Sequence, residues 1–133
     1  MICLDTDVLS DFLRKGAPPA VQRRLAELTA ENHFTTTVTL GELLYGAARR
    51  RSPSLWRTIE EYVAGDFSIL PFDEPAARVY AEMRVALESA GQRLDDPDLR
   101  IAAICLAHDL TLVTGNVRHF SRVPELRVEN WLE

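Results

Sequence analysis

A short apolar run over residues 1–4 stops abruptly at the polar triplet Asp5-Thr6-Asp7. An apolar run of this length predicts a buried β-strand. Asp5 then lies at the carboxyl end of that strand, and in open α/β sheets this edge is where ligands bind. The chain is therefore expected to form an α/β sheet with an acidic group on the edge that carries function.

Strand-like and helix-like segments alternate along the rest of the 133-residue chain. Further strands are predicted at residues 33–38, 67–72 and 110–114, with a short edge strand at 126–128. Helical patterns cover residues 8–13, 19–30, 39–50, 52–64, 74–90 and 97–107. Such alternation predicts a three-layer α/β/α fold around a mainly parallel sheet of about four to five strands. Because the chain shows no repeat and no linker, residues 1–133 are expected to form a single domain.

Three acidic residues each have a structural interpretation. Asp7 is placed to cap the helix that follows it, and Thr39 with Glu42 matches a Thr-x-x-Glu capping box. Asp98 lies in the first turn of a predicted helix, where a carboxylate interacts favourably with the helix dipole. Asp5 has no such explanation, because it ends a strand and has no evident capping role.

Polar residues follow two of the predicted strands at equivalent places. Asn116 follows strand 110–114 by two residues, as Asp5 follows the first strand. If these strands are neighbours, Asp5, Asn116 and the start of the Asp98 helix share one edge. Carboxylates gathered there repel one another unless a cation neutralises them. Oxygen ligands without a His or Cys cluster select Mg²⁺ or Mn²⁺ over zinc. The residues expected to bind metal and to act in catalysis are Asp5, Glu42, Asp98 and Asn116.

A hard divalent cation held by carboxylates is typical of sites that bind phosphate groups. Such a site can activate water and neutralise charge during in-line attack on a phosphodiester. The residues alone therefore favour metal-dependent phosphoester hydrolysis.

The basic residues are unevenly distributed in type. The net charge of −5 argues against non-specific coating of nucleic acid, but it leaves room for a local site. Fourteen of the fifteen basic residues are arginines, and the only lysine is Lys15. Arginine suits bidentate recognition of phosphate. Arg100 and Arg118, which lie within a turn or two of expected metal ligands, are therefore the predicted nucleic-acid contacts.

His33, His108 and His119 are isolated in the sequence, and none is expected to be a catalytic base.

The apolar segments indicate a cytoplasmic protein. No uninterrupted apolar stretch approaches the roughly 18 residues of a membrane span, and the chain lacks a signal-peptide pattern. Cys3 and Cys105 match no zinc or redox spacing and are expected to be small core residues. No membrane partner is expected.

Several motifs together resemble those of PIN-domain ribonucleases, and most of all the VapC toxins of type II toxin–antitoxin pairs. The motifs occur in the right order along the whole chain: Ile2-Cys3-Leu4-Asp5-Thr6-Asp7, Thr39-Leu40-Gly41-Glu42-Leu43, Asp98-Leu99-Arg100-Ile101-Ala102-Ala103, Leu112-Val113-Thr114-Gly115-Asn116-Val117-Arg118-His119-Phe120 and Arg127-Val128-Glu129-Asn130-Trp131.

This resemblance carries implications for the site. It assigns Asp5, Glu42 and Asp98 to the family's three acidic metal-site positions and Asn116 to a fourth. Asp7 departs from the family pattern, since many relatives have Asn there. The resemblance also implies a Mg²⁺- or Mn²⁺-dependent endoribonuclease that inhibits translation by cutting transfer or ribosomal RNA. Its implied partners are a VapB-type antitoxin and a second copy of the chain.

Two alternatives match a single motif only. Asp5-Thr6-Asp7-Val8 also fits the nucleophile motif of haloacid-dehalogenase-like phosphatases, in which Asp5 would form an aspartyl-phosphate. Phospho-receiver modules, which are not enzymes, carry acidic pairs after their first strand. Both classes hold phosphate with a lysine late in the chain, whereas the only lysine here is Lys15. A non-catalytic PIN scaffold is the remaining alternative, and the intact acid set argues against it.

Overall fold

The computed structural model describes residues 1–27 and 32–131. Its elements run in the order β1 (Ile2–Leu4), α1 (Thr6–Lys15), α2 (Pro19–Glu27), β2 (His33–Thr36), α3 (Thr37–Arg49), α4 (Pro53–Ile59), the π-helical segment η2 (Glu60–Ala64), β3 (Ser68–Leu70), α5 (Glu74–Ser89), α6 (Asp96–Ala107), β4 (Thr111–Val113), α7 (Val117–Phe120) and β5 (Val128–Glu129).

The strands form one five-stranded sheet in the order β3-β2-β1-β4-β5. Every neighbouring pair is parallel. Strand β1 is central, and its Cys3 is in register with Phe34 of β2 and Leu112 of β4. The predicted parallel sheet is therefore confirmed. The first strand pairs with 110–114, which meets the condition on which a shared edge depended. The carboxyl ends of β1 and β4 meet at one edge as a result.

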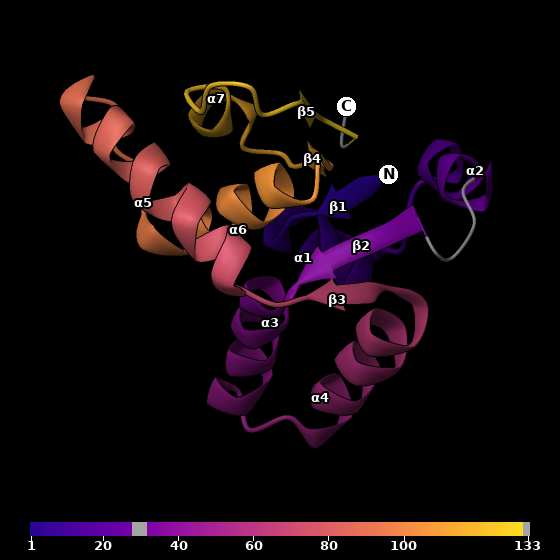
Figure 1. The fold of residues 1–133 in the computed structure, drawn as a ribbon. Helices are drawn as coiled ribbons and strands as arrows, with labels where there is room; N and C mark the ends of the chain where they lie inside the picture. The colour runs from indigo at the N-terminus through magenta and orange to yellow at the C-terminus, as the bar shows by residue number, and fades with distance from the viewer. Residues whose placement is uncertain (28–31, 132–133) are drawn as a thin grey trace.

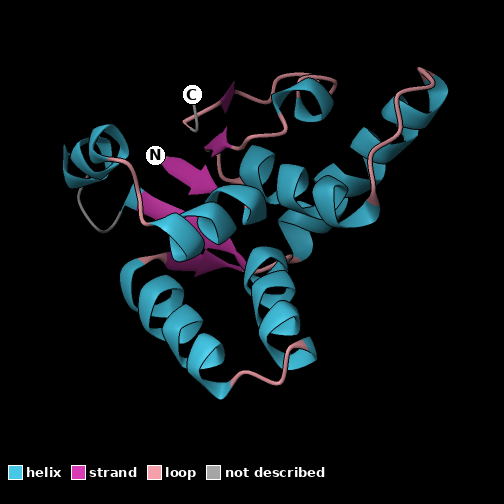
Figure 2. Cartoon of the chain, turned by 180° about the vertical axis from the view of Figure 1, so that it is seen from behind, coloured by secondary structure: helices cyan, strands magenta, loops and turns pink. Residues whose placement is uncertain are grey.

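Alternating side chains of the central strand enter two separate cores. Ile2 and Leu4 pack with residues of α1, α3 and α4 on one face of the sheet, including Leu43 and Ile59. Cys3 packs with α5 and α6 on the other face. Figure 1 shows α5 and α6 side by side, with the end of α5 extending away from the sheet. Figure 2, from behind, shows α3 and α4 as a pair of helices below the sheet. The three-layer α/β/α prediction is confirmed.

Helix α6 is the most deeply buried helix of the second core. Leu99 and residues 101–105 are all buried, which agrees with the nearly continuous apolar pattern of this segment. Cys3 and Cys105 are both fully buried and free, as expected of core residues. Among the described residues, no helix is both long and apolar enough to cross a membrane.

Two predicted helix caps are wrong. Asp5, not Asp7, caps α1, because β1 passes into the helix without a loop and the Asp5 carboxylate accepts a hydrogen bond from the Thr6 amide (2.7 Å). Thr36, not Thr39, caps α3, and its hydroxyl accepts from the Thr39 amide (3.1 Å). Helix α3 begins directly after Thr36, the last residue of β2, and α1 begins after the single intervening residue Asp5. Both helices begin earlier than the sequence pattern indicated.

Other boundaries differ for local reasons. The predicted helix 52–64 consists of α4 followed by the π-helical segment η2. Helix α7 was not predicted, since four residues are too few to show a helical period. Helix α6 already includes Asp96, and the short edge strand begins at Val128 instead of residue 126. The last residues of the predicted helix 19–30 lie outside the described residues.

The cap at Thr36 yields a stability prediction. Thr36→Ala should lower the free energy of unfolding by about 1–2 kcal/mol, because the amide of Thr39 loses its acceptor in a buried position. Thr37→Ala at the neighbouring exposed position is the matched control and should change stability by less than about 0.5 kcal/mol. Urea unfolding followed by circular dichroism measures both values. Equal effects for the two variants would contradict the assigned cap.

Candidate metal centre

Asp5 is the only charged side chain among the described residues that is classed as buried, with 5% of its surface exposed. Its amide donates to the Val113 carbonyl of β4 (2.9 Å), which extends the β1–β4 ladder by one residue. Its second carboxylate oxygen accepts a hydrogen bond from the Thr114 hydroxyl (2.8 Å). Burial is the largest cause that raises the pKa of Asp5, to about 7, and the charges of Asp7 and Asp98 raise it further. The hydrogen bonds from Thr114 and Thr6 act in the opposite direction and lower this pKa.

Asp98 lies in the first turn of α6 and is half-buried. Burial is again the largest cause of a raised pKa, which reaches about 6. The charges of Glu42 and Asp95 add to this shift, and His119 opposes it. Asp98 therefore lies within electrostatic range of Glu42 on α3 and Asp7 on α1.

Glu42 lies on α3, in the second turn, and is exposed. The hydroxyl of Thr6 donates to its carboxylate (2.7 Å) and also lies 3.1 Å from the Thr39 hydroxyl. Thr6 is the residue after Asp5, so this hydrogen bond fixes α3 beside the start of α1. Glu42 thus faces the same edge as Asp5 and makes no capping box with Thr39.

Asp7 links α1 to the loop that follows β4. Its carboxylate accepts hydrogen bonds from the Gly115 amide (3.0 Å) and the Thr114 hydroxyl (3.4 Å). The Asn116 amide in turn donates to the Thr114 hydroxyl (3.0 Å). Thr114 consequently connects both aspartates with the segment that carries Asn116. We refer to Asp5, Asp7, Glu42, Asp98 and Asn116 as the acidic edge.

His119 also belongs to this site, which was not predicted. Its Nδ1 is hydrogen-bonded to the side-chain oxygen of Asn116, and its charge acts on Asp98. The expectation that His119 is isolated is therefore wrong. The usable signal was its position three residues after Asn116, which brings the two side chains together once residues 117–120 form a helix. Thr114 was also missed, although its hydroxyl directly follows a buried strand.

The two predicted RNA-contacting arginines have different surroundings. Arg100 donates to Asp96 (2.6 Å), one helical turn earlier, and lies over the ring of Phe72 (4.9 Å). Arg118 is exposed on α7 and forms no ion pair within the described parts of the chain. Arg118 is thus the freer of the two guanidinium groups.

The acidic edge lacks compensating positive charge. None of its four carboxylates forms an ion pair with a lysine or arginine in the described residues. Acids elsewhere commonly do: Asp11, Glu74, Glu88, Asp96, Asp109 and Glu129. Repulsion between unpaired carboxylates favours binding of a cation, and the donor set of carboxylate and amide oxygens fits Mg²⁺ or Mn²⁺.

The side chains as they lie place limits on direct ligation. Among the described residues, no three His, Cys, Asp or Glu side chains are close enough together to hold one ion by themselves. Mg²⁺ commonly binds through only one or two carboxylates and completes its shell with water and substrate phosphate. The acidic edge therefore fits a hydrated divalent cation better than a closed protein cage.

Comparisons with known proteins agree with this description. The chain matches the PIN domain family over residues 2–126. It is 31% identical over 130 residues to Ribonuclease VapC2 of Rickettsia felis and 32% identical over 128 residues to the tRNA(fMet)-specific endonuclease VapC of Shigella flexneri, and each match covers 96% of both chains. The fold is similar to a chain in the crystal structure of VapBC2 from Rickettsia felis bound to a promoter DNA fragment. The TM-score is 0.88 at 29% identity, and the match covers 98% of this chain and 99% of that one.

The raised pKa of Asp5 yields a prediction for the metal-free protein. Native Asp5 keeps its proton up to pH about 7, whereas in the unfolded chain it titrates near 3.8. The native state therefore binds more protons between these values, and the free energy of unfolding should fall as pH rises from 4 to 7. The slope approaches roughly 1.4 kcal/mol per pH unit for one such group. Urea unfolding in EDTA across this range measures it.

Asp5→Asn should reduce this slope, because the variant cannot take up the proton. Asp66→Asn, at an exposed aspartate outside the acidic edge, is the matched control and should retain the parental slope. A parental slope in Asp5→Asn would show that the buried carboxyl does not hold a proton in the native state.

Proposed function

The chain belongs to the PIN-domain family, and on that premise we propose that it is a metal-dependent endoribonuclease of the VapC type. The observation that carries the proposal is the acidic edge. It gathers Asp5, Glu42 and Asp98 from three elements without a basic partner among the described residues. Phosphodiester hydrolysis needs such a charge arrangement, because divalent cations offset the charge of the phosphate that approaches. Residues 1–133 are proposed to act as one domain.

We assign Asp5, Glu42, Asp98 and Asn116 as the catalytic and metal-holding residues. Mg²⁺ or Mn²⁺ bound there would supply activation of water and neutralisation of the phosphate. The chain's own contribution is to position the ligands. Thr114 and the Thr6 amide hold the two oxygens of Asp5 by hydrogen bonds, and the Thr6 hydroxyl holds Glu42. Since hydrogen-bonded neighbours orient metal ligands, Thr6 and Thr114 are positioning residues.

The proposed substrate is transfer RNA, and inhibition of translation is the proposed consequence. One relative that matches 96% of the chain is named a tRNA(fMet)-specific endonuclease, and another is named a ribonuclease. The acidic net charge of −5 is compatible with RNA only if a local basic patch and a cation bind the phosphates. Ribosomal RNA is the alternative substrate within the same class.

A VapB-type antitoxin is the proposed partner, and the toxin is proposed to be a cytoplasmic homodimer. The similar chain from Rickettsia felis belongs to the crystal structure of VapBC2. An arginine of the antitoxin placed between the carboxylates of the acidic edge would form charge-assisted hydrogen bonds. The same arginine would replace the divalent cation that these carboxylates otherwise bind. One contact would then both bind the antitoxin and inhibit cleavage.

The phosphatase and phospho-receiver alternatives lose support from the position of Lys15. Lys15 lies at the end of α1 and pairs with Asp11 (3.3 Å) on the same helix, away from the carboxyl end of β1. Asp5 itself is buried and has both oxygens hydrogen-bonded, which disfavours a nucleophile. The intact acid set likewise argues against an inactive scaffold.

Cleavage of RNA should require the acidic edge and a divalent cation. Purified protein with unfractionated transfer RNA should cut in Mg²⁺ or Mn²⁺ and stop in EDTA. Asp98→Asn should lower the cleavage rate by at least about 100-fold while the fold is kept, because removing one like charge relieves repulsion. Asp66→Asn is the control and should cleave like the parent. Undiminished cleavage by Asp98→Asn would contradict the assigned site.

Both Arg118 and Arg100 are proposed RNA contacts, and Arg118 is expected to contribute more to RNA affinity. Arg118→Ala should weaken RNA binding and lower its salt dependence, because an uncommitted guanidinium is available for phosphate. Arg100→Ala should weaken binding less, since Arg100 must give up Asp96 to reach RNA. A salt titration of RNA affinity for the two variants tests this order. A larger loss in Arg100→Ala would reverse it.

A further inference from the structure

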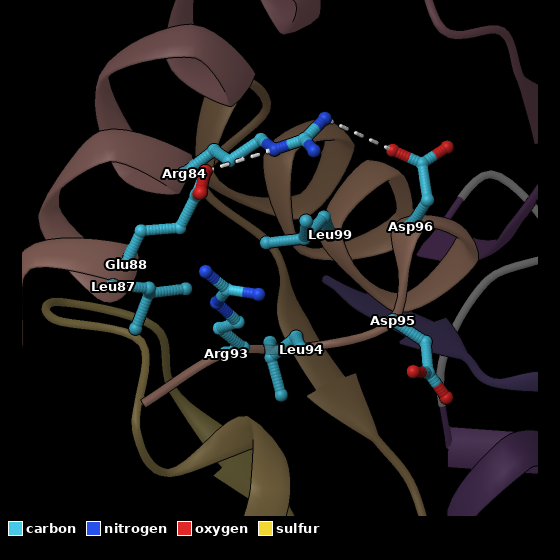
Figure 3. A pocket seen from close by; sticks show the side chains of 8 residues that line it. All are labelled: Arg84, Leu87, Glu88, Arg93, Leu94, Asp95, Asp96 and Leu99. Carbon is cyan, nitrogen blue, oxygen red and sulfur yellow. Dashed lines mark hydrogen bonds and ion pairs between the residues drawn. The ribbon is translucent and has the colours of Figure 1, made fainter. Parts of the chain in front are cut away.

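A pocket of about 250 Å³ lies beside the start of α6, between the end of α5 and the connecting segment. Leu87, Leu94 and Leu99 form its apolar part, and charged side chains surround them (Figure 3). The pocket shares its wall with the first turn of α6, which also carries Asp98. The pocket is therefore linked to the acidic edge through the first turn of α6, which contributes Asp96 and Leu99 to the pocket and Asp98 to the edge.

Two of the carboxylates at this pocket are already neutralised. Arg84 pairs with Glu88 (3.1 Å) and lies 3.8 Å from Asp96. Asp96 also accepts hydrogen bonds from Tyr80 and Arg100, and both interactions lower its pKa. These ion pairs fasten α5 to α6 and leave Glu88 and Asp96 little net effect on an anion in the pocket.

Arg93 is the cation that remains available. Its guanidinium points into the pocket among the leucines (Figure 3), and it forms no ion pair with any carboxylate of the described residues. The carboxylate of Asp95 points away from Arg93 in the same view. The charge of Asp95 instead acts on Asp98, whose pKa it raises.

The segment that carries Arg93 is tied to the other side of the site. The Arg122 guanidinium donates to the Arg93 carbonyl (3.1 Å), and Arg122 follows α7 closely. Arg118 is exposed on α7 itself. The Arg122 guanidinium thus lies beside the segment that carries Arg93, and Arg118 on α7 lies four residues before Arg122 and two residues after Asn116.

We propose that this pocket holds one unpaired nucleotide of the RNA next to the bond that is cut, with its phosphate on Arg93 and its base or ribose against Leu94 and Leu99. The proposal rests on the ribonuclease function proposed above and specifies how its substrate is held. Pockets for drug-sized ligands range from about 300 to 1,000 Å³, and this slightly smaller volume suits one nucleotide but no helix of a protein partner. Apolar contact with a splayed base and charge contact with its phosphate are the usual means of binding single-stranded RNA.

The test compares two arginines in a background that cannot cleave. Asp98→Asn protein is titrated with a fluorescein-labelled single-stranded oligoribonucleotide of random sequence, at several salt concentrations. Adding Arg93→Ala should weaken binding by about 5- to 10-fold and reduce the slope of log K against log salt by about 0.7, as expected for one lost phosphate contact. Arg23→Ala is the matched control. Arg23 is likewise exposed and unpaired among the described residues, and it lies on α2, across the molecule from α5 in Figure 1.

A second variant separates the apolar contact from the charge. Leu94→Trp fills the pocket and should weaken binding without changing the salt slope, because no charge is removed. Cleavage of unfractionated transfer RNA by the otherwise unmodified chain should show a raised KM for Arg93→Ala with little change in kcat. Circular dichroism confirms that each variant is folded.

An error in the nucleotide pocket and an error in the ribonuclease function would give different experimental results. If the parent binds and cleaves RNA but Arg93→Ala matches Arg23→Ala in affinity and salt slope, the pocket does not hold the substrate. Loss of affinity in Arg93→Ala alongside parental binding by Leu94→Trp would overturn the placement of the nucleotide inside the pocket. A parent that neither binds nor cleaves RNA would overturn the ribonuclease function itself.

Discussion

The Asp5 carboxylate joins the parts of this protein that must meet for a site to exist. It ends β1, caps α1 through the Thr6 amide, and accepts a hydrogen bond from Thr114 at the end of β4. These contacts are possible only because β1 and β4 are parallel neighbours, so that both strands end at the same edge. Helices α3 and α6 then bring Glu42 and Asp98 to a point that is already defined by the sheet.

The same arrangement works against the stability of the empty protein. Burial and neighbouring charges raise the pKa of Asp5 to about 7 and that of Asp98 to about 6, which means that ionised carboxylates are disfavoured in the native state. Any ligand that brings positive charge to this edge relieves the penalty. A divalent cation and an arginine of an antitoxin would therefore compete for the same uncompensated carboxylates of the acidic edge. Activity and inhibition would have the same physical origin.

Sequence reasoning located the main strands and helices and the parallel sheet, but it misplaced two helix caps and did not predict side-chain contacts. The strand before Asp5 and the helix after Asp98 follow from the hydrophobic pattern, and both are present. The capping roles given to Asp7 and Glu42 were wrong, because the chain passes from strand to helix without the expected turn.

Side-chain partnerships were harder to foresee. Asp96 lies four residues before Arg100, and Asn116 lies three residues before His119. Both pairs have helical spacing, but neither contact was predicted. The set Asp5, Glu42, Asp98 and Asn116 came from family resemblance together with the parallel-sheet argument.

Finally, the hydrogen bond between Thr114 and Asp5 joins positions 109 residues apart. Since a ribosome makes the chain from its N-terminus, Asp5 is synthesised long before β4, the strand that aligns it. The hydrogen-bonded edge therefore cannot be complete until β4 and Thr114 have been synthesised.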